Sequence, residues 1–524
     1  MPLFILFSVI LLSTAHSANV LVIGGMKGSH LYLSIDIANK LIEFGHDVTV
    51  LTLCKVNIDD KAFHLITLMN QEETDVVLKG WDVALQKWLH HPSKGMAMEY
   101  SLTWANLDPS AKRSEELAHK YFNGEEFSNI VDTGNFDLIV LEHSTSYYAR
   151  SSLNNRDIPI IGFLCHGVVQ DINDRFSLQR LINSEPGKMN DVTMSPPTFV
   201  ERWQTLERLG RVFIAKLSIS EDTPAKTDKR PENSDKAYYD VAFINDHPAF
   251  TFPFLKSPNA FYLGTFHLED RPLKPLPDDY LQFFANCPYK YTVLFSFGSF
   301  IRDITVFSGT STILETLRHM SVCVIIMSKI DLSLKFDLPA GNFLQRSWIP
   351  QKDLLGSGKL DFFISHCGNN GKLEAIHYNV PLICIPLCTD GYFNGRLVAG
   401  NKFGLLLTWE VLTQETLTRT VDQMLVERGT FVTNMRRAAE IARNDPGSGV
   451  GVLKFYTDLL IKNKNADYLI NRIISNQSTN EIYNLDIAAI ASILTLCLIG
   501  GVLFCLVKCF RMFCWKIVNK IKSD

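Results

Sequence analysis

Polar and aromatic side chains gather between Trp348 and Asn394 in a spacing that suits the binding of a nucleotide sugar. A short apolar run, Asp361–Ser365, predicts a buried strand, and His366 and Gly368 follow at its carboxyl end. We expect a helix to begin at about Asn370. The first N–H groups of a helix are unpaired, and the helix dipole places partial positive charge beside them. A strand that ends in a glycine turn before a helix therefore predicts a site for phosphate.

Two further side chains could hold the rest of a nucleotide. Trp348 lies at the end of an earlier strand-like run, and an indole face can stack on a base, which is worth about 1–3 kcal/mol. Glu374 lies one turn into the expected helix, where its carboxylate could accept hydrogen bonds from a ribose diol. A glycine turn, a lone tryptophan or a single histidine is weak evidence. The ordered set W-x-P-Q, H-x-G-x-N, a glutamate four residues after Asn370, and P-L-x-x-x-P-L before an aspartate is far more specific.

His30, near the other end of the chain, could act as a base. It belongs to Gly28-Ser29-His30, between the first predicted strand and the first helix. The pKa of a free imidazole, near 6.5, suits general-base catalysis. Taken alone, the residue would be interpreted as an ordinary helix-cap histidine. Glu142 ends a later strand, Phe136-Asp-Leu-Ile-Val-Leu-Glu142, and the alternative for it is a strand-end carboxylate in solvent.

Strands and helices alternate along the chain in two series that would position these groups. Strand Asn19–Ile23, helix Leu31–Phe44 and strand Asp47–Leu53 form a βαβ unit and predict a parallel sheet. We expect residues 60–130 and 170–235 to form helices and loops that line an acceptor cleft. The pattern predicts an α/β chain with two Rossmann-like domains that bind ligands at the carboxyl ends of parallel strands. The other predicted strands are Asp137–Leu141, Ile158–Phe163, Val241–Asn245, Ala260–Leu263, Tyr291–Phe297, Val322–Met327, Asp361–Ser365, Pro381–Pro386 and Gly404–Thr408.

Two apolar segments frame the chain and indicate that it enters a membrane. The apolar run Pro2–Thr14 is followed by the small-residue site Ala15-His16-Ser17 and predicts a secretory signal peptide. The alternative is a first core strand that extends toward the N-terminus. Ile487–Val507 carries no charge and is long enough to span about 30 Å of hydrocarbon as a helix. Basic residues follow it, so the positive-inside rule predicts a single-pass type I protein with a cytosolic tail.

Composition narrows the class of partners and the compartment. The net charge of −4 over 524 residues shows no basic excess, so no nucleic-acid partner is expected. Lys520 and Lys522 resemble a dilysine signal for retrieval to the endoplasmic reticulum, the alternative being a plain basic flank. Asn476-Gln-Ser478 is a glycosylation sequon. The eleven cysteines contain no C-x-x-C pair, and we predict neither a metal site nor a disulfide framework, with Cys384 and Cys388 in the core.

The motifs resemble those of the membrane-bound UDP-glucuronosyltransferases, most strongly over residues 291–403. The resemblance implies a GT-B fold, transfer from a UDP-sugar to a small lipophilic acceptor as in detoxification, inversion at the anomeric carbon, and no metal or other cofactor. It implies that His30 is the catalytic base, oriented by Glu142, where the family has aspartate. The donor residues that it implies are Ser299, Trp348, Gln351, His366, Gly368, Asn370, Gly371, Glu374 and Asp390.

The same resemblance divides the chain. A homo- or hetero-oligomer is compatible with the sequence. The expected parts are a signal peptide (1–17), an acceptor-binding domain (18–268), a linker (269–284), a donor-binding domain (285–465), a juxtamembrane segment (466–486), the span (487–507) and the tail (508–524).

Two positions depart from the family pattern. Cys367 replaces the first glycine of H-G-G, so the turn must accommodate a side chain. Gly391 replaces the glutamine of the family's D-Q pair, which holds the donor sugar, so the identity of the sugar stays open. An active glycosyltransferase is the main prediction, and a UDP-binding pseudoenzyme or partner subunit is the alternative. A single-span receptor is disfavoured because the tail is short and the ectodomain is no cysteine-stapled module.

Overall fold

The chain forms two compact units, Met1–Ile470 and Asn471–Asp524, which we describe separately. Most of the expected signal peptide, the segment 170–235, Cys388 and the sequon at Asn476 lie outside the described residues. The computed structural model describes residues 17–26, 28–56, 62–89, 109–153, 156–167, 239–251, 258–269, 271–299, 301, 303–307, 309–339, 341–387, 390–469 and 485–521.

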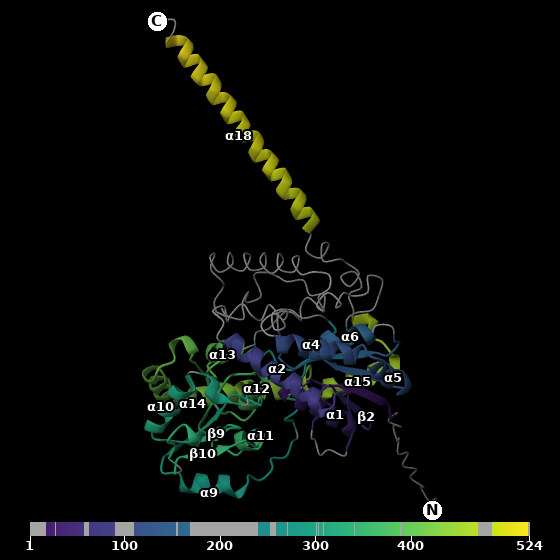
Figure 1. Cartoon of the computed structure of the whole chain (residues 1–524), viewed down its shortest axis with the longest axis vertical. Helices are drawn as coiled ribbons and strands as arrows, with labels where there is room; N and C mark the ends of the chain where they lie inside the picture. Colours follow the sequence, from purple (N-terminus) through teal and green to yellow (C-terminus); the bar gives the residue numbers. More distant parts are fainter. Residues whose placement is uncertain are drawn as a thin grey trace, which may run out of the picture. The chain divides into compact units, whose positions relative to one another are not determined.

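The first sheet has seven parallel strands in the order β3-β2-β1-β4-β5-β6-β7. Figure 1 labels its strand β2 and the helices α1, α2, α4, α5 and α6 of the same half. Every residue of β4 and β5 is buried, as expected for a parallel sheet with helices on both faces. Strand β3 lies within 60–130, where we predicted only helices and loops; that prediction was wrong, because this strand is short and none of its residues is fully buried. The strands are β1 (Asn19–Ile23), β2 (Asp47–Thr52), β3 (His64–Thr67), β4 (Leu138–Glu142), β5 (Ile160–Leu164), β6 (Val241–Ile244) and β7 (Ala260–Tyr262).

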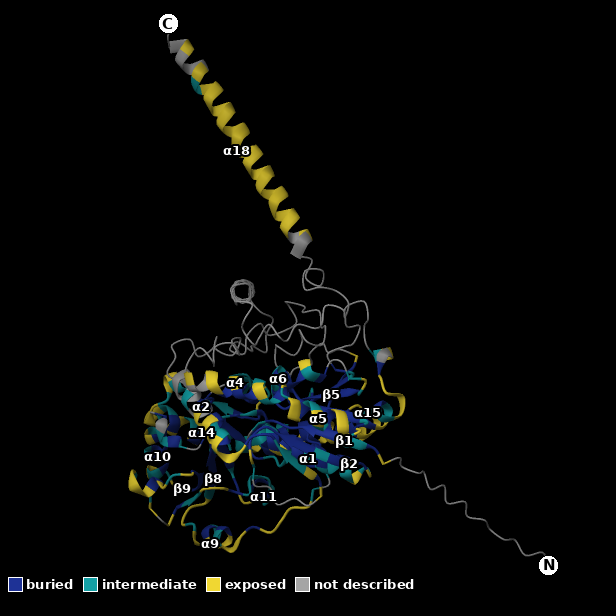
Figure 2. Ribbon diagram, turned by 45° about the vertical axis from the view of Figure 1, so that its right-hand side comes forward, coloured by how far each residue is buried: buried dark blue, intermediate teal, exposed yellow. Residues whose placement is uncertain are grey.

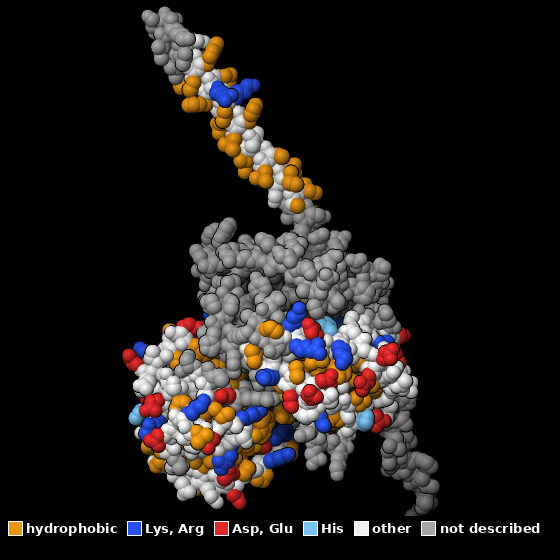
Figure 3. Space-filling model, in the orientation of Figure 1, with side chains coloured by type: hydrophobic (Ala, Val, Ile, Leu, Met, Phe, Trp, Pro, Cys, Tyr) orange, Lys and Arg blue, Asp and Glu red, His pale blue; other side chains and the backbone are white. Residues whose placement is uncertain are grey.

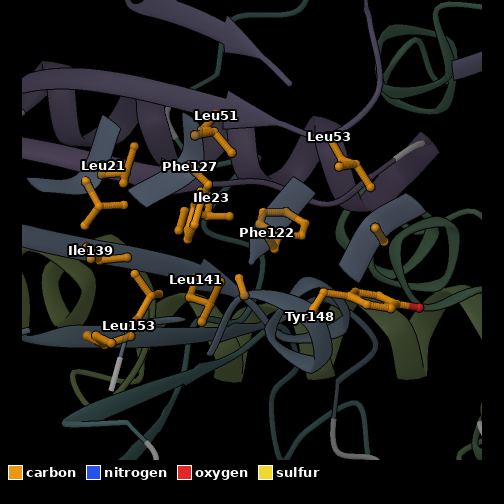
Figure 4. Packing of buried hydrophobic residues seen from close by; sticks show 14 of the residues in the cluster. Leu21, Ile23, Leu51, Leu53, Phe122, Phe127, Ile139, Leu141, Tyr148 and Leu153 are labelled. Carbon is orange, nitrogen blue, oxygen red and sulfur yellow. The ribbon is translucent and has the colours of Figure 1, made fainter. Parts of the chain in front are cut away.

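Helices between residues 71 and 153 cover one face of this sheet (Figure 4). The rings of Phe122 and Phe127 are fully buried and meet edge to face, 5.3 Å apart. They belong to the same core cluster as Ile23 of β1 and Leu141 of β4. These helices are α2 (Gln71–Leu89), α4 (Pro109–Phe122), α5 (Glu125–Thr133) and α6 (His143–Leu153). Helix α1 (Gly28–Glu43) packs in a separate cluster with Val20 and Val22 of β1.

The second sheet has six parallel strands in the order β10-β9-β8-β11-β12-β13. Figure 2 shows its strands as a buried layer beneath helices that expose their outer faces. The strands are β8 (Tyr291–Ser296), β9 (Val322–Met327), β10 (Phe343–Arg346), β11 (Phe362–Ser365), β12 (Leu382–Cys384) and β13 (Gly404–Leu406). The helices are α9 (Asp278–Asn286), α10 (Gly309–His319), α11 (Gln351–Gly356), α12 (Asn369–His377), α13 (Gly391–Gly400), α14 (Gln414–Asn444) and α15 (Gly449–Asn463).

The last helix of this unit returns to the first sheet. Val452, Leu453 and Leu460 of α15 belong to the same buried cluster as Val20 of β1 and Leu41 of α1. The chain therefore crosses back within the range that the sequence assigned to the donor-binding domain. This crossing ties the two sheets into one compact unit.

The second unit consists of one described helix, α18 (Leu485–Ile521). Its stretch Ala489–Trp515 is long and apolar enough to cross a membrane. The helix extends past the predicted span of 487–507. Figure 3 shows hydrophobic side chains along this helix, interrupted by basic ones. In the sequence, Lys508 and Arg511 are the basic residues within Ala489–Trp515.

Candidate active site

His30 and Glu142 form a hydrogen-bonded pair at the carboxyl edge of the first sheet. Strands β1 and β4 pair in parallel with Ile23 opposite Leu141, so the loop after β1 lies beside the end of β4. His30 lies in the first turn of α1, and its Nδ1 is 2.9 Å from Glu142 Oε1. The Glu142 carboxylate also accepts hydrogen bonds from the hydroxyl of Ser144 and the backbone N–H of Thr145. These contacts hold both side chains in one arrangement.

Electrostatics fix the protonation pattern of this pair. Burial alone would lower the pKa of His30, but the charge and hydrogen bond of Glu142 outweigh burial and raise it. Burial alone would raise the pKa of Glu142, and His30 and Ser144 together hold it well below its usual range. Glu142 is therefore a carboxylate, and Nδ1 of His30 carries the proton that it donates. In the neutral form of His30 the other nitrogen, Nε2, carries the basic lone pair, and the raised pKa makes it a stronger base.

Two residues that we did not predict complete this edge of the sheet. Cys165 and His166 follow β5, the strand next to β4. The ring of His166 meets that of His30 edge to face, with centroids 4.2 Å apart. Cys165, His30 and Glu142 present ligand atoms within 4.8 Å of one another, but burial raises the pKa of the Cys165 thiol, which disfavours a metal-binding thiolate. Both residues could have been predicted from the sequence, because they follow the strand next to β4 and therefore lie at the same edge of the sheet.

On the donor side, the predicted nucleoside residues lie close together. Gln351 begins α11 and donates a hydrogen bond of 2.7 Å to Glu374 of α12. Burial raises the pKa of Glu374. Trp348 is 50% exposed, and its ring lies 5.7 Å from that of Tyr32 on α1. An exposed indole beside a paired amide and carboxyl group matches the arrangement expected for a base and a ribose.

His366 is held between two glycines at the end of β11. A Cβ on Gly298 would come within 2.6 Å of the ring, and one on Gly368 within 2.5 Å. Gly298 also has a φ of +83°, which only glycine adopts readily. The Nδ1 of His366 is buried without a hydrogen-bond partner in the structure, and burial lowers the pKa of the ring. Ser299 follows Gly298, and its hydroxyl lies 3.3 Å from where a Cβ on Gly28 would stand.

The N-terminus of α12 meets the first sheet. The Asn370 amide donates to Ser29 O at 3.3 Å and accepts from Asn245 at 2.8 Å. Its side chain, predicted to meet phosphate, is thus bonded to the other half of the unit. The backbone N–H groups of Asn370 and Gly371 lie in the first turn, where a helix does not pair them internally. Those two N–H groups remain suited to an anion.

Asp390 caps the same helix. Its carboxylate accepts from the backbone N–H of Asn369 at 2.7 Å and from the Asn394 amide at 2.9 Å. Asp390 is 8% exposed. Its charge contributes to the raised pKa of His30 and opposes the lowering of the His366 pKa by burial, so it lies within electrostatic range of both rings. The structure therefore brings the predicted sugar-binding aspartate close to both histidines.

A buried ion pair lies behind this cap. Lys372 of α12 is completely buried, and its ammonium lies 3.1 Å from Asp246 Oδ2 and 3.0 Å from Asn394 Oδ1. Asp246 follows β6, so the pair joins the two sheets. Nothing in the sequence pointed to it, because a lysine within a helix ordinarily faces solvent.

Cysteine pairing differs from the prediction. Cys367 forms a disulfide with Cys384, and Cys287 forms one with Cys323. The expectation of no disulfide framework was wrong, because residues on adjacent strands and their loops come together only in the fold. Cys367 has a left-handed φ of +57°, the conformation for which the family's glycine is suited. The turn thus accommodates the side chain by directing it into a buried disulfide.

Gly391 begins α13 against the active-site turn. A Cβ at this position would come within 2.5 Å of the backbone oxygen of His366. Backbone atoms cannot move aside as a flexible side chain would. The missing glutamine is therefore matched by a backbone arrangement that leaves no room for a side chain at this position.

Comparisons with known proteins find a matching family model and several relatives. The family model described as UDP-glucoronosyl and UDP-glucosyl transferase matches residues 18–524. UDP-glucosyltransferase 2 of Dactylopius coccus is 28% identical over 44% of this chain and 43% of its own length. UDP-glucuronosyltransferase 2B7 of Homo sapiens is 26% identical over 54% of this chain and 51% of its own. The chain thus spans about half the length of these two curated relatives. UDP-glucuronosyltransferase 3A2 of Homo sapiens is 24% identical over 98% of this chain and 97% of its own length.

Solved structures show the fold. Os79 from O. sativa, crystallised with U2F and trichothecene, superposes with a TM-score of 0.58 at 16% identity over 84% of this chain and all of that chain. CalG4, the calicheamicin glycosyltransferase, superposes with a TM-score of 0.53 at 15% identity over 85% of this chain and 99% of its own. The two Rossmann-like sheets and these neighbours establish the GT-B fold.

Proposed function

The chain belongs to the UDP-glucoronosyl and UDP-glucosyl transferase family, and we propose that it transfers a hexosyl or glucuronosyl group from a UDP-sugar to a hydroxyl of a small lipophilic acceptor. The observation that carries this proposal is the His30–Glu142 pair, at 2.9 Å, beside the helix terminus that would hold the diphosphate. A base and an anion site at neighbouring edges are what such a transfer requires.

The reaction begins when Nε2 of His30 takes the proton of the acceptor hydroxyl. The oxygen attacks the anomeric carbon as the bond to UDP breaks on the opposite face, so the configuration inverts. The bonding electrons and the negative charge leave with UDP, and the proton stays on His30. Glu142 stabilises the imidazolium that forms, which is the electrostatic effect that raises the pKa of His30. A general base of this kind contributes about 10²–10⁴ in rate.

The departing UDP is stabilised by neutral donors. The first-turn N–H groups of α12, the hydroxyl of Ser299 and the His366 ring would contact the diphosphate. Trp348 would stack on uracil. Glu374 keeps acceptor capacity beyond its bond to Gln351 and would bind the ribose hydroxyls. These donors supply the neutralisation that a metal ion would otherwise provide, so we propose a reaction without one.

The site would face the lumen of the endoplasmic reticulum, with α18 as a single type I span. The basic residues after the predicted span and the lysines near the C-terminus support this orientation. The two disulfides support it as well, since disulfides persist in oxidising compartments. Masking the C-terminus with a fused domain should release the protein to the cell surface. An unchanged location would contradict retrieval by the terminal lysines.

Gly391 favours one alternative, a UDP-binding pseudoenzyme or partner subunit. The family's D-Q pair holds donor hydroxyls, and here only Asp390 carries a side chain. A site without that contact loses discrimination between sugars. Binding of UDP without turnover would identify this alternative.

One experiment separates the two. The purified full-length protein in detergent is screened for thermal stabilisation by UDP and by a panel of UDP-sugars, and then for transfer to a panel of phenols, steroids and fatty acids. A UDP-sugar that stabilises more than UDP and is consumed only when an acceptor is present supports the transferase. Equal stabilisation by UDP and every UDP-sugar, with no product, would overturn it.

A further inference from the structure

The ring of His166 lies against that of His30. It follows Cys165 at the carboxyl end of β5, and β5 neighbours β4, the strand that ends in Glu142. The ring centroids of His166 and His30 lie 4.2 Å apart with an interplanar angle of 69°. Glu142 holds the Nδ1 side of His30. His166 and Glu142 thus both contact the imidazole of His30, from different strand ends.

The nitrogens of His166 are available for a ligand. Its ring contacts that of His30, and the charges of Asp390 and Glu142 act on it, but among the described residues neither nitrogen has a hydrogen-bond partner. The residue is partly exposed rather than buried. By contrast, Nδ1 of His30 is bonded to Glu142 and contacts the Ser144 hydroxyl. An imidazole held beside a base with both nitrogens unused is well placed to contact substrate.

The surroundings keep His166 neutral. Burial and the neighbouring His30 lower its pKa to about 4, against the opposing charges of Asp390 and Glu142. Cys165, the other titratable group here, is a protonated thiol because burial raises its pKa. A neutral imidazole has one N–H donor and one lone pair, and it does not compete with His30 for the proton at neutral pH.

We propose that His166 binds the acceptor hydroxyl, donating an N–H to the oxygen whose proton passes to His30. A hydroxyl oxygen has two lone pairs, so it can accept this bond while its second pair attacks the anomeric carbon. The proton balance is unchanged: one proton moves from the hydroxyl to His30, and His166 stays neutral throughout. The proposal rests on the proposed function and assigns the residue that positions the nucleophile.

Two substitutions separate this role from simple packing. His166→Phe keeps a flat ring against His30 but removes both nitrogens, whereas His166→Gln keeps a donor and an acceptor without the ring. A hydrogen bond to a group that develops charge is worth about 10–100-fold. We therefore expect H166F to lower acceptor kcat/KM by about 10–100-fold, and H166Q to retain most of it. His319→Phe, at an exposed histidine on α10, is the matched control.

The measurements are acceptor kcat/KM, UDP affinity, melting temperature and the pH profile of each variant in full-length protein. We expect UDP affinity and the acid limb of the pH profile to match wild type in H166F, because His166 carries no charge there. Normal transfer by H166F with a defect in H166Q would show that His166 only packs, and would overturn this inference alone. If wild-type protein transfers sugar to no acceptor, the proposed function fails and this inference fails with it. A lower melting temperature together with weaker UDP binding in H166F would show a structural role instead, and would also overturn it.

Discussion

Replacing Glu142 by glutamine tests the catalytic pair with little change in shape. The carboxylate is 1% exposed and accepts from His30, Ser144 and Thr145. Glutamine offers one oxygen and one NH₂, so its NH₂ must face a donor or lose a partner. His30 would lose both its orientation and the charge that stabilises its imidazolium. We expect kcat to fall by about 10²–10⁴, the usual worth of a general base.

The pH profile gives the sign of the effect. Glu142 is the main group that raises the pKa of His30 against burial. Without the carboxylate, burial dominates and the pKa of His30 falls, so the acid limb of the pH profile of kcat/KM should move to lower pH in E142Q. E142D keeps the charge but shortens the side chain by about 1.5 Å, so we expect a smaller loss and a limb that moves less. E142Q activity within twofold of wild type, with an unmoved limb, would refute the assignment.

Stability should follow the same linkage. The raised pKa of His30 contributes stability that is full below the unfolded value of 6.5 and is lost as pH rises through the folded value. The depressed pKa of Glu142 contributes above 4.5 and is lost on acidification. Both contributions are present between about pH 4.5 and 6.5. The melting temperature of E142Q should therefore fall below wild type by more at pH 5.5 than at pH 8.

Three further substitutions have expected outcomes. Lys372→Met leaves Asp246 buried and unpaired, so unfolding by denaturant should show a free energy of unfolding that is lower by about 3–5 kcal/mol. The control, Lys352→Met at a partly exposed ion pair, should lower it by at most about 1 kcal/mol. Equal losses in the two variants would contradict the role of the buried pair. Cys384→Ser opens a disulfide of sequence separation 17 and should cost about 3 kcal/mol of stability. A reductant should then destabilise wild type by more than it destabilises the variant, which of the two described disulfides keeps only Cys287–Cys323. Gly391→Gln should lower the free energy of unfolding by about 1–3 kcal/mol, and with it the melting temperature, without raising the rate of sugar transfer. A variant that is as stable as wild type and transfers sugar faster would contradict this.

Much of the fold could be predicted because strands buried on both faces are continuous apolar runs. Leu138–Glu142 and Val322–Met327 are fully buried in the structure and stand out in the sequence for the same reason. Strand β3 was missed because its sequence, His64–Thr67, is short and only partly buried. The helices between Gln71 and Thr133 were expected only as a class, since their polar composition does not fix their bounds.

The site divides in the same way. His30 and Glu142 could be related in advance because both end parallel strands or follow them, and such ends share one edge of a sheet. Lys372, His166 and the Cys367–Cys384 disulfide could not, because each depends on contacts between segments far apart in sequence. A helical lysine looks solvent-exposed until Asp246 is placed opposite it. Cysteine spacing likewise leaves many pairings open.

The most direct test of the central claim is the steady-state rate of sugar transfer by His30→Ala, measured with a donor and an acceptor that the wild-type protein uses. UDP affinity and melting temperature are measured on the same samples to show that the donor side and the fold are intact. We expect transfer to fall by at least about 10²-fold while UDP affinity stays within twofold. Transfer at the wild-type rate would contradict the assignment of His30 as the base that activates the acceptor.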